Sequence, residues 1–335
     1  MRFDKIHPIE LTFVLAALFA ALPAFGADMV YMANGIKIGE VDQDSAIVWT
    51  RLTEAPEGDA YGEPFPQVDG GSNAGADLST AELTGGRSLD EMKGAAPGAE
   101  GLVQFVCEPD GRPEDQQRSP WLAARADHDC TRQFTFERLA PGQAYRVLVE
   151  GKPDADSPPT CSVEGRFRTA PAPDDPADVS FVVVTCGDYP RRDAPENGHT
   201  IYRSMLRLDP DFFVHTGDIE YYDKPLPYAP NLELARFKWN RFYALPFQRE
   251  FHRHVASYFI KDDHDTLRDD CWPKQRYGDL TWEQGLATFR EQVPMGEKTY
   301  RTRRWGKHVQ VWLVEGRDYR SPNIMPDGPE KSIWG

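Results

Sequence analysis

Side chains that can bind metal ions follow the predicted strands in the second half of this 335-residue chain. Four such groups occur, namely Cys186-Gly187-Asp188, Gly217-Asp218 with Tyr221, Asp262-Asp263-His264-Asp265, and Glu315-Gly316-Arg317-Asp318. In parallel sheets the carboxyl ends of the strands meet at one edge, where binding sites lie. Burial of a carboxylate without a partner costs free energy, and a cation bound at this edge would offset that cost. The alternative is that these aspartates only cap ordinary turns.

The segment FIKDDHDT, residues 259–266, is the most informative of these groups. Adjacent carboxylates followed by a histidine, directly after a strand, predict that Asp263 binds a metal ion. His264 would then hydrogen-bond a phosphoryl oxygen or a leaving group. A solvated acidic loop is the alternative, and Asp262 and Asp265 are expected to be exposed members of the loop under either interpretation.

Predicted strands and helices alternate after residue 178. The strands are VSFVVVTC (179–186), FFVHTGD (212–218), ASYFIKDDHD (256–265) and VQVWLVEGRD (309–318), and the helices are HTIYRSMLRLD (199–209) and LTWEQGLATFREQV (280–293). This order predicts an α/β domain with a largely parallel sheet. The continuous apolar run at 179–186 is typical of a strand buried on both faces.

The first half of the chain predicts an all-β sandwich instead. Short segments alternate apolar and polar residues, among them SAIVWTRL (45–52), GLVQFVCE (101–108), RQFTFERL (132–139) and GRFRTA (165–170). LAPGQAYRVLVEG (139–151) resembles a corner of fibronectin type III and immunoglobulin-like sandwiches. Residues 61–100 lack periodicity and are expected to form a long loop. We therefore predict a sandwich at 27–170, a Pro/Asp linker at 171–178 and an α/β domain at 179–335.

Charge and the N-terminal segment limit the partners and the compartment. A net charge of −15 argues against nucleic acid or an anionic membrane as a partner. The apolar run LTFVLAALFAALPAFGA (11–27), preceded by Arg2 and Lys5, indicates a signal peptide at 1–26. A secreted or periplasmic protein without a stable membrane span is expected, and a retained anchor is the alternative. Export permits disulfides, and one bridge is plausible among Cys107, Cys130 and Cys161.

The chain resembles the alkaline phosphatase D (PhoD-like) family of secreted metallophosphoesterases from about residue 34 onward. NGIKIGEVDQDSAIVWTRL (34–52) and GRFRTAP (165–171) are similar to the two ends of that family's N-terminal sandwich. TCGDYP, HTGDIEYY, KDDHD and RRWGKHVQVWLVEGRDYRS resemble its catalytic blocks in the right order. The resemblance implies a fibronectin type III/Ig-like β-sandwich followed by an α/β metallophosphoesterase domain. The family's domain continues with further ligands, so a partial domain is expected.

The resemblance also implies a ligand set and metals. The family's cysteine ligand falls on Cys186, its bridging aspartate on Asp218 and its tyrosine ligand on Tyr221, with Asp263 as a further ligand. The metals implied are iron (Fe³⁺) and calcium, although another divalent metal is possible. A phenol has a pKa near 10, so binding as phenolate suits a strong Lewis acid such as ferric iron. Asp188 is a ligand, a partner of a ligand or a turn residue, and Glu220 is an extra carboxylate of unknown role.

The resulting functional prediction is hydrolysis of a small phosphate ester. A metal-activated hydroxide would attack phosphorus, His264 would contact the phosphate or the leaving group, and Arg191, Arg192 or Arg317 would neutralise charge. These residues do not separate a monoester from a diester. One alternative is an inactive, truncated homologue that acts as a binding or adhesion module. A Cys186 nucleophile with His264 is disfavoured, because nearby carboxylates raise a thiol pKa.

Overall fold

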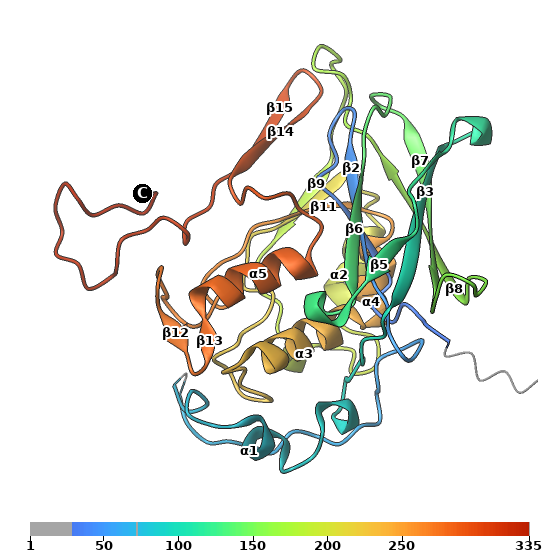
Figure 1. Cartoon of the computed structure of the whole chain (residues 1–335). Coiled ribbons are helices and arrows are strands. Elements are labelled where there is room, and N and C mark those ends of the chain that lie inside the picture. The colour runs from blue at the N-terminus through green and yellow to red at the C-terminus, as the bar shows by residue number, and fades with distance from the viewer. Residues whose placement is uncertain (1–28, 72, 335) are drawn as a thin grey trace, which may run out of the picture.

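A computed structural model describes residues 29–71 and 73–334, so the predicted signal peptide at 1–26 lies outside the described residues. A six-stranded sheet forms the centre of the molecule (Figure 1), with the order β6-β2-β1-β11-β10-β9. Its strands are β1 (Ile36–Gly39), β2 (Ala46–Arg51), β6 (Thr131–Phe136), β9 (Phe181–Val184), β10 (Phe212–His215) and β11 (Ala256–Phe259). Strands β9, β10, β11 and β1 run parallel, whereas β1, β2 and β6 pair antiparallel.

A second sheet and the five α-helices of the described residues complete the layers. The second sheet pairs β4 (Gln117–Arg118), β3 (Gly101–Pro109), β7 (Ala144–Lys152) and β8 (Cys161–Arg168), with β5 (Leu122–Ala124) also paired to β3. The helices are α1 (Thr80–Thr84), α2 (Thr200–Leu206), α3 (Leu232–Tyr243), α4 (Pro246–His252) and α5 (Trp282–Gln292). Two hairpins, β12 (Arg276–Tyr277) with β13 (Leu280–Thr281) and β14 (Arg301–Trp305) with β15 (Val309–Leu313), stand outside both sheets.

The two faces of the central sheet bury different partners, because side chains alternate along each strand. Phe213 and Phe259 belong to a core cluster with side chains of α2, α3, α4 and α5. Phe212 and Tyr258 point the other way, into a cluster with β3, β7, β8 and Trp305. Figure 1 shows α3 and α5 on the opposite side of the central sheet from β3 and β7.

The predicted sandwich and α/β parts share one sheet. Strands β1, β2 and β6 come from the predicted sandwich, yet β1 pairs with β11 of the predicted α/β part. The sheet is therefore mixed, where the sequence predicted a largely parallel one, because three N-terminal strands extend it in antiparallel fashion. The domain boundary at 171–178 remains a prediction. Backbone hydrogen bonds between β1 and β11 join the segment before this boundary to the segment after it.

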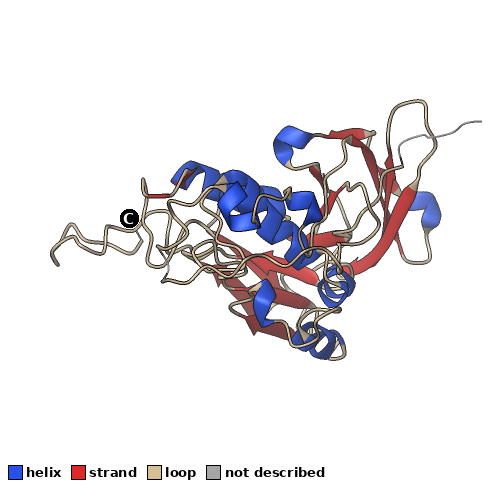
Figure 2. Ribbon diagram, turned by 90° about the horizontal axis from the view of Figure 1, so that it is seen from below, coloured by secondary structure: helices blue, strands red, loops and turns tan. Residues whose placement is uncertain are grey.

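Two predictions about individual strands are wrong. Strand β9 is an edge strand whose Phe181 and Val183 are 49% and 54% exposed, so it is not buried on both faces. Strand β15 pairs only with β14 and not with the central sheet, so residues 315–318 do not follow a strand of that sheet. Residues 314–334 contain neither helix nor strand. Glu315, near the start of this segment, is buried, and the chain then runs away from the body of the molecule (Figures 1 and 2).

The predicted long loop is present, whereas the predicted disulfide is not. Residues 61–100 form a long connection that contains α1 and a short 3₁₀ turn at Leu89–Glu91, as the missing periodicity predicted. All five cysteines are free, so the bridge expected among Cys107, Cys130 and Cys161 is absent. Among the described residues no helix has the length and apolar character needed to cross a membrane.

Candidate metal centre

Three loops leave the central sheet at the same level. His215 pairs with Val184 of β9 on one side and with Phe259 of β11 on the other. The three parallel strands therefore end together, and the loops 185–188, 216–223 and 260–266 leave from one edge. This register brings the predicted ligand groups after β9, β10 and β11 to a common place, as expected for parallel strands.

The backbone of these loops is strained where the chemistry lies. Cys186, Asp188 and Asp218 have φ angles of 60°, 79° and 56°, a region that non-glycine residues rarely adopt. Such conformations persist where the surrounding structure enforces them, and they cluster at functional sites. Three backbone hydrogen bonds enforce them here. The N–H groups of residues 186, 187 and 188 donate to the carbonyls of Gly217, Asp218 and Ile219 at 3.0, 2.7 and 2.9 Å.

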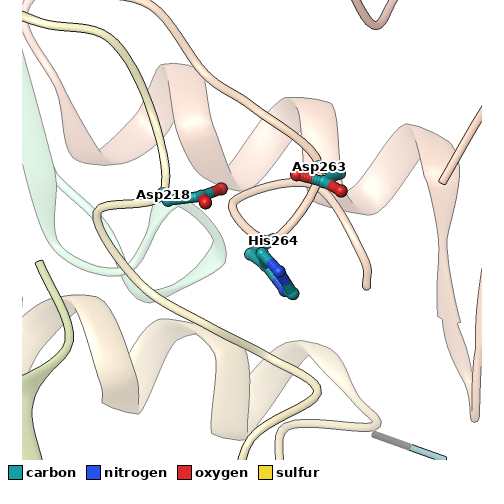
Figure 3. Close-up of side chains that lie close together, drawn as sticks. All are labelled: Asp218, Asp263 and His264. Carbon is teal, nitrogen blue, oxygen red and sulfur yellow. The ribbon is translucent and has the colours of Figure 1, made fainter. Parts of the chain in front are cut away.

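Asp218, Asp263 and His264 form the centre of the site. One potential ligand atom from each side chain lies within 4.8 Å of the others, and Figure 3 shows the three side chains close together. Two carboxylates and an imidazole are a donor set that binds divalent and ferric metal ions. The predicted ligands Asp218 and Asp263 and the predicted catalytic His264 are therefore brought together.

Cys186 and Tyr221 converge on the same carboxylate. The Cys186 Sγ lies 3.9 Å from Asp218 Oδ2, and the Tyr221 hydroxyl donates a 3.4 Å hydrogen bond to that oxygen. The Tyr221 ring also lies 4.4 Å from the His264 ring, centroid to centroid. The neighbouring Tyr222 is different, since its hydroxyl accepts a 2.6 Å hydrogen bond from Trp239 inside the core. Of the two tyrosines, only Tyr221 is placed as a candidate ligand.

The residues of this cluster fit a bound metal. Asp218 Oδ1 is buried and has no hydrogen-bond partner among the described residues, and a cation would supply one. Burial raises the pKa of the Asp218 carboxyl to about 6; the charge of His264 opposes this rise, and the charges of Asp263 and Asp262 add to it. Burial, a hydrogen bond with Cys186 and the charge of Asp218 hold the pKa of the Tyr221 phenol well above its usual range. A strong Lewis acid is therefore needed before Tyr221 can bind as phenolate.

Asp188 and Glu220 lie beside the centre and have other partners. The Asp188 carboxylate is buried, and its Oδ2 lies 3.5 Å from Arg191 Nε. Glu220 is fully buried with its Oε2 3.7 Å from Lys238 Nζ. The Lys238 ammonium also donates to the carbonyl of Tyr221 at 2.6 Å. Lys238 therefore holds the loop 216–223 through both the Glu220 side chain and the Tyr221 carbonyl. The sequence did not reveal this structural contact of Glu220.

Asp223 is a site residue that the sequence reasoning missed. Its fully buried carboxylate lies 2.6 Å from His264 Nδ1 and also accepts a 2.9 Å hydrogen bond from the backbone N–H of Asp269. Burial lowers the pKa of His264, but the hydrogen bond and charge of Asp223, with Asp263 and Asp218, raise it overall. The only signal in the sequence is a second aspartate five residues after Asp218.

The predicted cations lie in different environments. Arg317 pairs with Asp262 and lies 3.5 Å from Asp263, so it offsets the negative charge of the loop 260–266. The Arg191 side chain is 62% exposed, and its guanidinium lies 5.8 Å from the centre of the Tyr221 ring. Lys224, which the sequence reasoning did not single out, lies 3.4 Å above that ring. Arg192 hydrogen-bonds the carbonyls of Tyr189 and Pro195 instead.

Buried ion pairs attach the segment after β15 to the site, although that strand lies outside the central sheet. Lys261 Nζ lies 3.0 Å from Glu315 and 2.6 Å from Asp318. Glu315 also accepts hydrogen bonds from the backbone N–H groups of Arg317 and Asp318. The fourth predicted group therefore reaches the loop 260–266 through side chains and not through strand register.

Comparisons with known proteins show what the chain is similar to. The family model of PhoD-like phosphatase matches residues 181–333. A solved structure described as PhoD superposes with a TM-score of 0.65 and 17% identity, over 94% of this chain and 59% of that one. Purple acid phosphatase PPD1 from yellow lupin (Lupinus luteus) gives a TM-score of 0.46 and 12% identity, over 81% of this chain and 42% of that one. No curated protein matches the chain.

The chain shares the fold of the PhoD structure, and the candidate site lies at the ends of the parallel strands of that fold. The match over residues 181–333 confirms the resemblance to the PhoD-like phosphatase family seen in the sequence. The chain spans 59% of the length of the PhoD structure that it matches.

Proposed function

We propose that this protein is a metal-dependent phosphoric ester hydrolase of the alkaline phosphatase D type, secreted or periplasmic, that acts on small phosphate esters. The observation that carries the proposal is the buried, unpartnered Asp218 oxygen within reach of Asp263 and His264. Cys186, Asp218 and Tyr221 would hold iron, and Asp218 with Asp263 would hold calcium or another divalent ion. When bound, such ions polarise a phosphoryl oxygen and lower the pKa of water.

His264 supplies the proton in this proposal. Its Nδ1 is engaged by Asp223 at 2.6 Å, so the tautomer is set and Nε2, which lies 3.7 Å from the exposed Asp269 carboxylate, is the nitrogen left for a substrate. An imidazole held in this way can hydrogen-bond a phosphoryl oxygen and donate a proton to the leaving alkoxide. Asp223 stabilises the positive charge of the protonated imidazole until the imidazole donates its proton.

Cationic side chains around the centre bind the substrate in this proposal. Arg191 and Lys224 lie next to the Tyr221 ring and can contact the phosphoryl oxygens or the remainder of the ester. Arg317 is already engaged with Asp262 and Asp263, so its role is to offset the charge of the ligands. The acidic surface of the molecule makes such local cations necessary for an anionic substrate.

The test combines metal content with hydrolysis. We expect the full chain to bind metal and to hydrolyse p-nitrophenyl phosphate or bis-p-nitrophenyl phosphate, and Asp218→Ala to lose both properties. Asp174→Ala in the exposed linker is the matched control and should retain them. Elemental analysis and the two assays on all three proteins decide the outcome. A wild-type chain without metal, or an active Asp218→Ala variant, would favour the alternative of an inactive binding module.

A further inference from the structure

Asp265 is buried, although the sequence predicted an exposed position for it. Its side chain is 0% exposed, and both of its carboxylate oxygens are engaged by backbone N–H groups. Oδ2 accepts from Asp218 at 2.6 Å and from Asp262 at 3.1 Å. Oδ1 accepts from Ile219 at 2.7 Å and from Glu220 at 3.1 Å. One carboxylate therefore collects four N–H groups.

These N–H groups come from both ligand-bearing loops. Asp218, Ile219 and Glu220 follow β10, whereas Asp262 follows β11 and directly precedes Asp263. The left-handed φ of 56° at Asp218 helps turn successive N–H groups toward one side, where they form an anion-binding concavity. Asp265 fills this concavity from the neighbouring loop, so its side chain joins two segments more than 40 residues apart in sequence.

The hydrogen bonds of Asp265 also argue against its being a metal ligand. Its two oxygens are saturated by N–H donors, and it is not among the three side chains that share the candidate metal position. The first of its donors is the backbone of Asp218, and another is that of Asp262, next to Asp263. Small shifts of this carboxylate would therefore move the two metal-binding carboxylates relative to each other.

We propose that Asp265 is a positioning residue that locks the Asp218 loop to the Asp263–His264 loop and so preorganises the metal ligands. The inference rests on the proposed function, because it assigns Asp265 a purpose in that same site. Residues that orient metal ligands typically change metal affinity by about 10- to 100-fold when replaced. A residue that only capped a turn would change stability and leave metal affinity as it was.

The test uses Asp265→Asn in the full chain. The amide keeps the shape but replaces one acceptor oxygen by an NH₂ group that faces N–H donors. We expect about 10- to 100-fold weaker Mn²⁺ binding, followed by electron paramagnetic resonance. We also expect faster hydrogen exchange at the amides of Asp218, Ile219 and Glu220 in the metal-free protein. Should this variant fail to fold, Asp265→Ser retains one acceptor oxygen and replaces it.

Asp211→Asn is the matched control. The Asp211 carboxylate also accepts a backbone N–H from another segment, that of Ser180 at 2.8 Å, but at the far end of β9 and β10. It should leave Mn²⁺ affinity unchanged. Wild-type Mn²⁺ affinity in a folded Asp265→Asn variant, or unchanged exchange at the three amides, would overturn the inference. If the wild-type chain binds no Mn²⁺, the proposed function fails, and the exchange experiment alone still decides whether Asp265 locks the loops.

Discussion

At the scale of single residues, the site depends on acids whose partners differ. Asp218 has a buried oxygen without a partner, whereas Asp223 is satisfied by His264 and by a backbone N–H. The first arrangement leaves room for a cation, and the second orients an imidazole. The same residue type therefore serves two purposes within five positions, and the difference arises from what each carboxylate touches.

The Asp223–His264 pair should act as one unit. We expect Asp223→Asn and His264→Gln each to lower kcat of phosphate ester hydrolysis by about 100-fold or more, since general acid catalysis contributes about 10²- to 10⁴-fold. The double variant should be little worse than His264→Gln, because each change disables the same function. Steady-state kinetics of the four proteins measures this. Asp174→Asn, an exposed position in the linker, is the control that should stay active. Additive losses in the double variant would contradict the pairing.

At the scale of elements, β1 joins two parts of the chain that the sequence separated. It pairs antiparallel with β2 and parallel with β11, and Gly39 is the residue opposite Ser257. A Cβ on Gly39 would lie 2.6 Å from the carbonyl oxygen of Ser257 and 2.7 Å from Pro294. The close approach of β1 and β11 therefore needs a glycine at this position. Because β11 leads into the Asp263 loop, this contact supports the site.

Gly39→Ala tests that contact. We expect it to lower the free energy of unfolding by about 1–3 kcal/mol, the usual cost of added volume at a packed position. Gly296→Ala is the matched control, because no atom lies within 4 Å of the Cβ that it would introduce. Its effect should stay within about 0.5 kcal/mol. Urea unfolding of both variants provides the comparison, and equal stabilities would contradict a tight junction between β1 and β11.

At the scale of the whole molecule, two cores lie on the two faces of the central sheet, and each holds residues from distant parts of the chain. The core under the helices also encloses imidazoles. His215 and His252 are 0% and 1% exposed, and burial lowers the pKa of His215 to about 3. Burial, with the nearby charges of Lys37 and His215, holds the pKa of His252 well below its usual range. Both histidines are therefore neutral in the folded protein at pH 5.

These histidines should make the protein less stable in mild acid. Below about pH 6.5 the unfolded chain takes up protons on both imidazoles and the folded chain does not, so the free energy of unfolding falls as the pH falls. Each histidine contributes a slope of about 1.4 kcal/mol per pH unit well below pH 6.5. The raised pKa of Asp218 acts in the opposite sense, so the contribution of a histidine is read from the difference between a variant and the wild type.

His252→Gln isolates one of these contributions. The slope of stability against pH between 6 and 4.5 should be about 1.4 kcal/mol per pH unit shallower than in the wild type. His128→Gln is the control, because the exposed His128 side chain is in contact with water in both states and its loss should leave the slope unchanged. Urea unfolding across this pH range measures all three slopes. Equal slopes in His252→Gln and wild type would show that His252 is not held neutral by burial.

The amino-acid sequence by itself determined the types of the candidate ligands and their place at strand ends. Cys186, Asp218, Tyr221, Asp263 and His264 follow apolar runs, and local patterns of this kind depend only on neighbouring residues. Their convergence follows from the register of three parallel strands, which the alternation of strands and helices made predictable. The match to the PhoD-like phosphatase family model also covers these residues.

Only the tertiary structure decided which further acidic residues contact the candidate site, and which strands pair with one another. The roles of Asp223 and Asp265 depend on hydrogen bonds to residues 41 and 47 positions away, and no local pattern encodes a pairing across such distances. The sequence also did not predict the exposure of β9 or the pairing of β1 with β11. An apolar strand has the same sequence pattern at the edge of a sheet as at its centre. Burial and pairing are properties of the assembled sheet, and they emerge only when distant segments pack against one another.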